Sequence, residues 1–282
     1  MIRILVDSAS EYRSDEAAKR GIDVLPLIIL LGGKEYRDGE TISPDEFYEL
    51  IESGQGFPKT SQLSPVAFSD YFKEAYEAGD EVIYIALDSH LSGTIQSAEL
   101  GINLSGAEGI YIVDSTNATA SNMILADYAA DLRDHGKSAQ EIVDALNEVK
   151  TRVRCVAGLN TLDYLAQGGR LPKAAASVVS AANLKPIICL QGEGVTLLSM
   201  GMGMNRAISS VVKHVGKLGV DPDFPFYAIW SYGRKNTDKF VKKISEQGVS
   251  VDKTLQIGCV IGSHIGPEAF GCVFVSAKED EN

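Results

Sequence analysis

The first half of the chain alternates between short apolar runs and longer stretches with one apolar face. The apolar runs are typical of strands buried on both faces of a parallel sheet, and we expect such strands at residues 2–6, 82–87, 110–113 and 153–157. Apolar residues three or four positions apart predict helices at residues 66–78, 95–102, 121–134 and 139–149. The alternation predicts an N-terminal α/β domain over residues 1–159, similar to a Rossmann fold with a parallel sheet.

Residues 27–59 fit this alternation less well. The sequence Gly32-Gly33-Lys34 is typical of a hairpin turn between apolar residues 27–31 and residues 35–37. A helix is predicted at residues 44–53. We therefore expect a small β-ribbon insertion followed by one helix.

The second half has a different order of elements. A turn at residues 168–172 precedes an alanine-rich helix at 174–182, and a hairpin pairs residues 187–190 with 195–198. Further elements are predicted in the order helix, strand, helix, strand and strand, at residues 205–218, 226–231, 235–247, 255–261 and 271–275. This order predicts a C-terminal α/β sandwich over residues 160–282, with a mixed or antiparallel sheet and helices to one side.

Composition and charge exclude several classes of protein. The 282 residues contain 26 Lys and Arg against 38 Asp and Glu, a net charge of −12, so the protein repels nucleic acid and anionic membrane surfaces. The apolar N-terminal run reaches Asp7 too early for a signal peptide. The longest apolar run, residues 24–31, is far shorter than the roughly 20 residues of a membrane-spanning helix. We expect a soluble cytoplasmic protein that makes at most brief contact with membranes.

Cysteines, histidines and common motifs offer no conventional catalytic or metal centre. The four cysteines are far apart in apolar surroundings, which indicates reduced core thiols, and the four histidines lack metal-ligand spacing. The chain contains no dinucleotide-binding glycine motif, Walker loop, zinc-protease motif or serine-hydrolase elbow. We therefore predict no metal and no cofactor.

Hydroxyl side chains gather at predicted junctions between strands and helices. The segments 59–65 and 88–94 place Ser and Thr residues before helices, where free backbone N–H groups can hold an anion. The pairs Asp7-Ser8 and Asp114-Ser115 follow predicted strands in the same way, so four loops are expected to converge on one crevice. The simpler interpretation is that these residues only cap helices.

Residues 257–271 contain five glycines and one proline. This density predicts a strand, a tight loop that presents His264, and a return strand whose backbone approaches another group closely. A single histidine can equally be a structural residue.

Six motifs that occur in order along the chain resemble those of the DegV family. They read Thr60-Ser61-Gln62-x-Ser64-Pro65, Leu91-Ser92-Gly93-Thr94-x-Gln96-Ser97-Ala98, Val113-Asp114-Ser115, Leu162-x-Tyr164-Leu165-x-x-Gly168-Gly169-Arg170, Lys185-Pro186-Ile187 and Ile261-Gly262-x-His264-x-Gly266-Pro267. The resemblance implies two α/β domains with a long-chain fatty acid held between them. It also implies a partner, because several members of the family are the fatty-acid-binding subunit of bacterial fatty acid kinase.

The resemblance further implies which residues meet the ligand. Thr60, Ser92 and His264 match the family's positions for the fatty-acid carboxylate. We add the neighbouring loop residues Ser61, Gly93 and Thr94 to the predicted carboxylate site, and Arg170 and Arg206 as head-group or kinase contacts.

Two alternative functions use the same residues. An acyl hydrolase or transferase would have Ser61, Ser92 or Ser115 as nucleophile and His264 as base, oriented by Asp7 or Asp114. A sugar or ketone binder would instead use His264 to contact a carbonyl group. We favour the fatty acid, because no serine lies in a nucleophile elbow, no aspartate has a clear sequence link to His264, and the apolar hairpin and helices of the second half suit an apolar ligand. Burying about 14 methylene groups at ~0.8 kcal/mol each would give roughly 11 kcal/mol before association costs.

Overall fold

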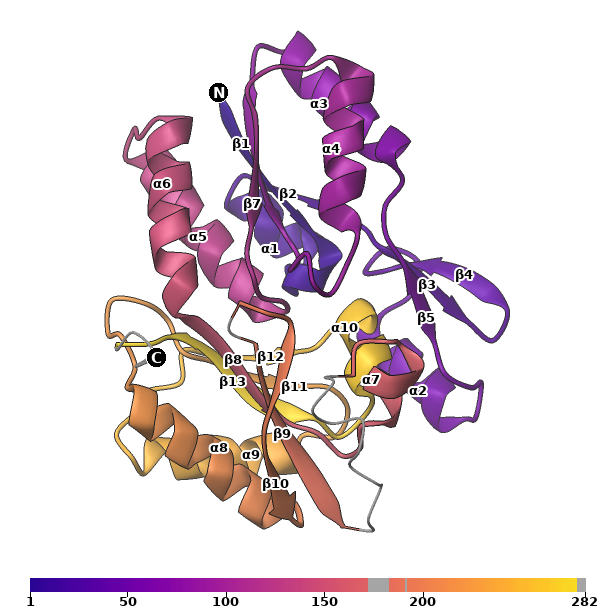
Figure 1. Ribbon diagram of the computed structural model, residues 1–282, viewed down its shortest axis with the longest axis vertical. Coiled ribbons are helices and arrows are strands. Elements are labelled where there is room, and N and C mark those ends of the chain that lie inside the picture. The colour runs from indigo at the N-terminus through magenta and orange to yellow at the C-terminus, as the bar shows by residue number, and fades with distance from the viewer. Residues whose placement is uncertain (172–182, 191, 278–282) are drawn as a thin grey trace.

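The protein consists of two packed α/β layers and a small β-ribbon (Figure 1). The computed structural model describes residues 1–171, 183–190 and 192–277. The predicted helix at 174–182 lies outside these residues. The strands described form a four-stranded sheet, a six-stranded sheet and a three-stranded ribbon, which confirms the predicted α/β fold with one parallel and one mixed sheet.

The first sheet is parallel throughout, in the order β2-β1-β6-β7. Its strands are β1 (Ile2–Asp7), β2 (Ile22–Leu25), β6 (Glu81–Ala86) and β7 (Ile110–Asp114). The sequence analysis missed β2, because the apolar run that contains it continues past Pro26 into the ribbon. Around the sheet lie α1 (Ser14–Lys19), α3 (Pro65–Glu77), α4 (Thr94–Ser105), α5 (Ala120–Asp134) and α6 (Ala139–Val149). Helices α3 and α4 cover one face, and α5 and α6 cover the other (Figure 1).

The ribbon projects from this first layer (Figure 1). Its antiparallel order is β4-β3-β5, with β3 (Ile28–Leu31), β4 (Lys34–Arg37) and β5 (Lys59–Ser61). The hairpin of β3 and β4 and the helix α2 (Pro44–Glu52) are as predicted. The third strand was not predicted, and it places Thr60 opposite Ile29.

The second sheet is mixed, in the order β10-β9-β8-β13-β11-β12. Its strands are β8 (Val153–Gly158), β9 (Leu184–Leu190), β10 (Val195–Met202), β11 (Tyr227–Trp230), β12 (Lys253–Gln256) and β13 (Phe270–Val275). Only β11 and β12 pair in parallel. The prediction that residues 153–157 join the parallel sheet is wrong, because β8 pairs antiparallel with both β9 and β13. A strand buried on both faces has the same apolar pattern in either kind of sheet, so the pattern could not decide between them.

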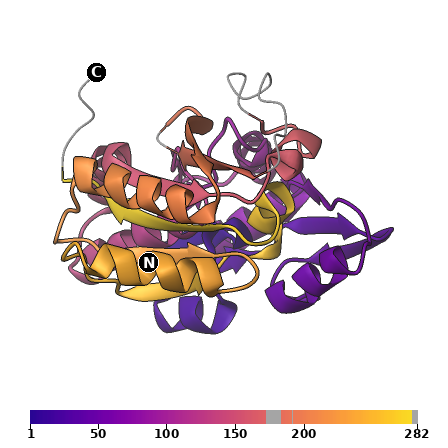
Figure 2. The same cartoon turned by 90° about the horizontal axis from the view of Figure 1, so that it is seen from below.

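Helices cover one face of the second sheet, as predicted. Figure 2 shows α8 (Met204–Leu218) and α9 (Lys235–Ser245) side by side over the strands. Phe226, Phe240 and Phe270 are fully buried between these helices and the sheet, in a core of their own. The opposite face of the sheet joins the larger core of the first layer, so the functional pocket described below lies between two sheets.

Two short helices lie where the sequence predicts a loop and a strand. Helix α7 (Asp163–Gln167) precedes the Gly168-Gly169 turn, and α10 (Cys259–Ile265) carries His264. The prediction of a strand to residue 261 and a loop at His264 is wrong, because β12 ends at Gln256 and a helix follows Gly258. Contacts with the N-terminal half of the chain hold this helix in place. The local sequence pattern around His264 does not indicate them.

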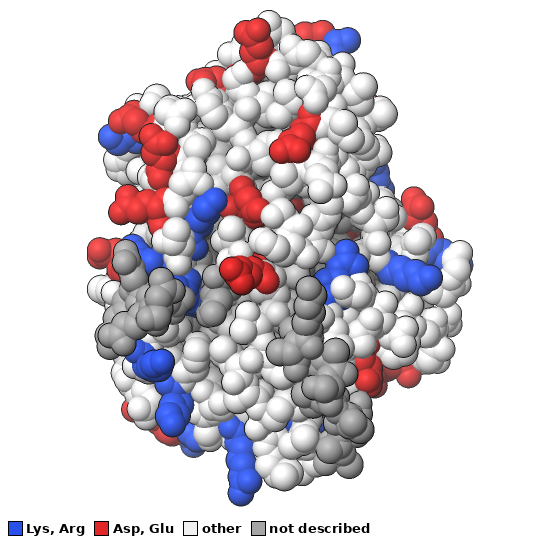
Figure 3. All heavy atoms as spheres, viewed as in Figure 1, with Lys and Arg blue, Asp and Glu red and all other residues white. Residues whose placement is uncertain are grey.

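Charge lies at the surface and the thiols lie inside. On the face shown in Figure 3, acidic and basic side chains are interspersed, and several Lys and Arg side chains lie together toward its lower edge. All four cysteines are buried and free, which confirms their predicted place in the core. Among the residues that the structure describes, no helix is long and apolar enough to cross a membrane.

Candidate functional site

A cavity of about 480 Å³ lies between the two sheets. Both halves of the chain contribute its apolar wall, with Leu27 and Leu87 from the first half and Cys155, Ile188 and Leu190 from the second. Its volume is within the range of small-molecule sites, about 300–1,000 Å³. The walls are therefore suited to an apolar ligand.

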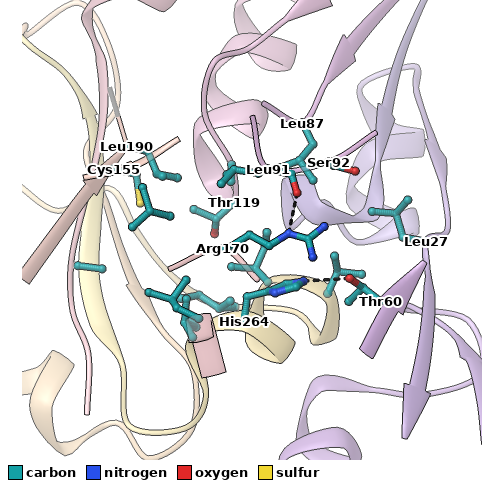
Figure 4. A pocket seen from close by; sticks show the side chains of 18 of the residues that line it. Leu27, Thr60, Leu87, Leu91, Ser92, Thr119, Cys155, Arg170, Leu190 and His264 are labelled. Carbon is teal, nitrogen blue, oxygen red and sulfur yellow. Dashed lines mark hydrogen bonds between the residues drawn. The ribbon is translucent and has the colours of Figure 1, made fainter. Parts of the chain in front are cut away.

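Polar side chains line one end of the cavity. Thr60 on β5 and His264 on α10 point toward each other, with Thr60 Oγ1 and His264 Nε2 2.9 Å apart (Figure 4). Both residues are half-buried, whereas Cys155 and Leu190 at the opposite end are buried (Figure 4). The polar end thus faces the opening, and the apolar end is closed.

The imidazole of His264 is neutral at physiological pH. Burial lowers its pKa to about 4, with a smaller effect from the nearby positive charge of Arg170. The Nδ1 atom is buried, and no described residue forms a hydrogen bond with it. Gly168 packs against this side of the ring, since a Cβ added at Gly168 would lie 2.2 Å from Nδ1. The ring is held by packing on one edge and by Thr60 on the other.

Arg170 connects the second half of the chain to the Ser92 loop. Its Nε donates to the backbone carbonyl of Leu91 at 2.9 Å (Figure 4), and its Nη1 donates to the carbonyl of Gly168 at 2.5 Å. These bonds place a cation beside the polar end of the cavity, where the predicted head-group contact requires it.

The Ser92 loop lies at the start of α4. Ser92 and Gly93 line the cavity, while the side chain of Thr94 is fully buried in the first turn of the helix. The hydroxyls of Ser92 and Thr94 are 2.6 Å apart. Ser92 also accepts from the backbone N–H of Thr94, at 3.3 Å, so it acts partly as a cap, as the simpler interpretation holds.

Gln62 packs directly on Gly93, so a side chain at position 93 would displace the end of the Gln62 side chain. A Cβ at Gly93 would lie 2.2 Å from Gln62 Oε1. Gln62 Nε2 in turn donates to Ser97 Oγ at 2.8 Å, which joins the Thr60 loop to α4. Ser61 lies beside Gln62 at the exposed rim of the cavity, and Ser64 is a helix cap outside it.

The prediction that four loops converge on the crevice is wrong for the Asp7-Ser8 loop, and only the last part of the loop after β7 reaches the cavity. Asp7 is buried and accepts from Tyr84 Oη at 2.8 Å, and Ser115 donates to the carbonyl of Asn117 at 3.0 Å. Neither Asp7-Ser8 nor Asp114-Ser115 lines the cavity, because these polar groups brace neighbouring backbone, but Ala118 and Thr119 at the end of the loop after β7 do line it. Arg206 is exposed on the first turn of α8 and does not line the cavity either.

The sequence analysis missed two polar residues of the cavity wall, Gln62 and Thr119. Gln62 stands inside a motif that had been noted only for its hydroxyls. Thr119 follows the Asp114-Ser115 loop and is buried, and its hydroxyl donates to Glu11 Oε1 at 2.9 Å. No local sequence pattern indicates this contact, because 108 positions separate Thr119 from Glu11.

The geometry gives little support to a serine-dependent hydrolase. In the described part of the chain, the hydroxyls of Ser61, Ser92 and Ser115 bond to Gln62, Thr94 and Asn117, not to His264. A base in such an enzyme needs a third group on its other nitrogen. No described residue supplies one at Nδ1 of His264.

Comparisons with known proteins agree with this architecture. Residues 1–277 match the DegV family, described as uncharacterised proteins. A DegV domain-containing protein of Caldanaerobacter subterraneus is 34% identical over 280 residues, covering 97% of this chain and 98% of the relative.

Solved structures are similar over nearly the full length. A fatty-acid-binding DegV family protein of Thermus thermophilus has a TM-score of 0.87 at 29% identity, covering 98% of this chain and 99% of that one. A stearic-acid-binding protein of Eubacterium ventriosum has a TM-score of 0.88 at 26% identity, covering 98% of both chains.

Proposed function

This chain belongs to the DegV family, and we propose that it binds a long-chain fatty acid in the cavity between its two sheets. The carboxylate would lie at the polar end beside Thr60, Ser92 and His264, and the acyl chain would extend toward Cys155 and Leu190. Support comes from the fatty-acid-binding proteins of the same fold.

The observation that carries the proposal is the separation of polar and apolar lining along one cavity. An acyl chain gains about 0.8 kcal/mol for each methylene that it buries, so the closed apolar end supplies most of the affinity. The buried Cys155 and Leu190 mark this end. A ligand with a polar group at its far end would lose this gain.

The polar end supplies selectivity for the head group. A carboxylate buried without partners costs several kcal/mol, and hydroxyl, imidazole and backbone N–H donors remove that cost. The hydroxyls of Thr60 and Ser92, the neutral imidazole of His264 and the cation of Arg170 surround the place where a carboxylate would sit. The same carboxylate would face the opening.

The position of the head group also supports a finer proposal. A carboxylate at the opening is accessible to a second protein, so the chain would present the fatty acid to a fatty acid kinase subunit. Arg170 at the cavity and the exposed Arg206 would contact the phosphate donor or that partner. The chain itself would act as the binding subunit, without a cofactor.

Isothermal titration with palmitate and with hexadecanol tests the proposal. We expect palmitate to bind more tightly than the alcohol, and Thr60→Val and His264→Ala each to weaken palmitate binding by about 1–3 kcal/mol. Ser64→Ala is the matched control, because Ser64 caps α3 outside the cavity and should affect stability only. Equal affinity for acid and alcohol, or unchanged palmitate binding in both cavity variants, would contradict the assignment.

A further inference from the structure

A buried carboxyl group joins two walls of the cavity from behind. Glu11 follows the short 3-10 helix η1 (Ser8–Ser10) in the N-terminal half and is 9% exposed. Its Oε1 accepts from the hydroxyl of Thr119 at 2.9 Å, and its Oε2 accepts from the backbone N–H of Gly258 at 2.5 Å. Thr119 lines the cavity, and Gly258 is the N-cap of the helix that carries His264.

Both residues of the Glu11–Thr119 bond have strained backbones. Glu11 has φ 63° and Thr119 has φ 56°, in a region that residues other than glycine rarely adopt and that a β-branched residue adopts least of all. Such conformations persist only where surrounding contacts hold them, and they concentrate at functional sites. Here the two strained residues are hydrogen-bonded to each other, although 108 positions separate them in the sequence.

Other contacts from the N-terminal half hold only the segment at the start of α10. Asp38 accepts from the backbone N–H of Cys259 at 3.3 Å, and Tyr48 donates to the carbonyl of Ile257 at 3.0 Å. Glu11 differs from them because its second oxygen binds Thr119, a residue of the cavity wall that lies on a different element. A change at Glu11 therefore acts on both walls at once.

We propose that Glu11 is a positioning residue for the head-group site, which sets His264 against Thr60 by holding Gly258 at one end of α10 and Thr119 in the cavity wall. The role in ligand binding rests on the function proposed above; the effect on His264 does not. Since α10 has only seven residues, a displacement at Gly258 is transmitted directly to His264.

The two hydrogen bonds of Glu11 do not require its negative charge. Burial raises its pKa to about 8, opposed by the N–H of Gly258 and reinforced by Asp38 and Asp7. A protonated carboxyl and a glutamine amide both accept from an N–H through the carbonyl oxygen, and a threonine hydroxyl can reverse its bond to suit either. Glutamine should therefore replace glutamate, whereas alanine should not.

The test compares Glu11→Ala with Glu11→Gln and with Asp80→Ala as a matched control. Asp80 is another buried carboxylate of the first layer, but it binds the Met1 amino group and Arg3 at the N-terminal ends of the central strands β1 and β6. The first readout is the imidazole NMR signal of His264 in the ligand-free protein, followed through a pH titration. The second is the Kd for palmitate.

We expect Glu11→Ala to shift the His264 signal, to move the pKa of His264 toward its ordinary value, and to raise the Kd at least about tenfold. Glu11→Gln should leave the signal in place and the Kd within about threefold. Asp80→Ala should change neither, even where it lowers stability. A His264 signal in Glu11→Ala identical to that in Asp80→Ala would overturn the proposal.

A second variant disturbs the same contact from the other side, should Glu11→Ala not fold. A Cβ at Gly258 would lie 2.9 Å from Glu11 Oε2, and the backbone there, with φ −69°, accepts alanine. Gly258→Ala should therefore shift the His264 signal in the same direction. If no variant and no wild-type protein binds palmitate while the His264 signal still shifts, the proposed ligand is wrong and the positioning role stands. An unmoved His264 signal in Gly258→Ala counts against the positioning role.

Discussion

The two ends of α10 respond to burial in opposite ways. At its start lie the carboxyls of Glu11 and Asp38, and burial raises the pKa of both, that of Glu11 to about 8. Near its end lies His264, whose pKa burial lowers to about 4. Removing water penalises the charged form, which is the anion for an acid and the cation for a histidine. Burial therefore favours the neutral form of the side chains at both ends of the helix.

The largest expected effect is on the pH dependence of stability, and it comes from ionisation of the buried carboxyl group of Glu11. Below its ordinary pKa of 4.5, Glu11 is protonated in both the folded and the unfolded protein; between 4.5 and about 8 only the folded protein holds the proton. The contribution of Glu11 to stability is thus lost as the pH rises through this window. The glutamine of the Glu11→Gln variant cannot titrate. The free energy of unfolding of the variant, relative to that of the wild type, should therefore rise by up to about 4 kcal/mol between pH 4 and pH 9.

Urea unfolding of both proteins across this pH range measures that difference. Asp7 and Asp38 are present in both chains, so their contributions cancel to first order. A difference that does not change with pH would mean that Glu11 is ionised in the folded protein.

His264 should make stability depend on pH with the opposite sign. Between pH 6.5 and about 4 the unfolded protein holds a proton on His264 that the folded protein does not, so stability falls as the pH falls through this window. Because His264 is half-buried, we expect His264→Gln to remove about 2 kcal/mol of this dependence, less than the full pKa difference implies. Unfolding curves at pH 4, 5, 6 and 7 would detect it, and parallel curves for the two proteins would rule it out.

A smaller effect tests the packing of His264 without changing its chemistry. Gly168 has φ −77°, which alanine accepts, but its Cβ would overlap Nδ1 of His264. We expect Gly168→Ala to displace the ring and to weaken palmitate binding by about tenfold, near 1.4 kcal/mol.

Gly216→Ala provides the comparison for Gly168→Ala. Gly216 lies inside α8 with no heavy atom within 4 Å of the added Cβ, so this change should leave the Kd unaltered and raise stability by about 0.5–1 kcal/mol. Equal Kd values for the two variants would show that the position of the ring does not matter for binding.

Local signals predicted most helices and the strands with clear boundaries. Helix α6 spans residues 139–149 as predicted, because Ser138 and Glu141 form a capping box that fixes its start. Ser64 and Pro65 likewise begin α3. These features involve residues within a few positions of each other, so the sequence displays them directly.

The candidate site was predicted in part. Thr60, Ser92 and His264 do line one cavity, although their binding to a carboxylate stays a prediction. Thr119 was missed, and His264 was placed on a loop when it lies on a helix. Both residues depend on contacts that are distant in the sequence, since Glu11 bonds to Thr119 and to Gly258 over separations of 108 and 247 positions.

The sequence by itself determined most of the longer helices and strands, the family, and the residue types that could meet an anion. Only the tertiary structure decided that β8 joins the second sheet, that three of the four hydroxyl loops reach the cavity, and that His264 is neutral. Capping and periodicity act within one or two turns of the chain, whereas sheet membership and desolvation depend on what packs from far away. The chemistry of this site therefore follows from which distant segments exclude water around it.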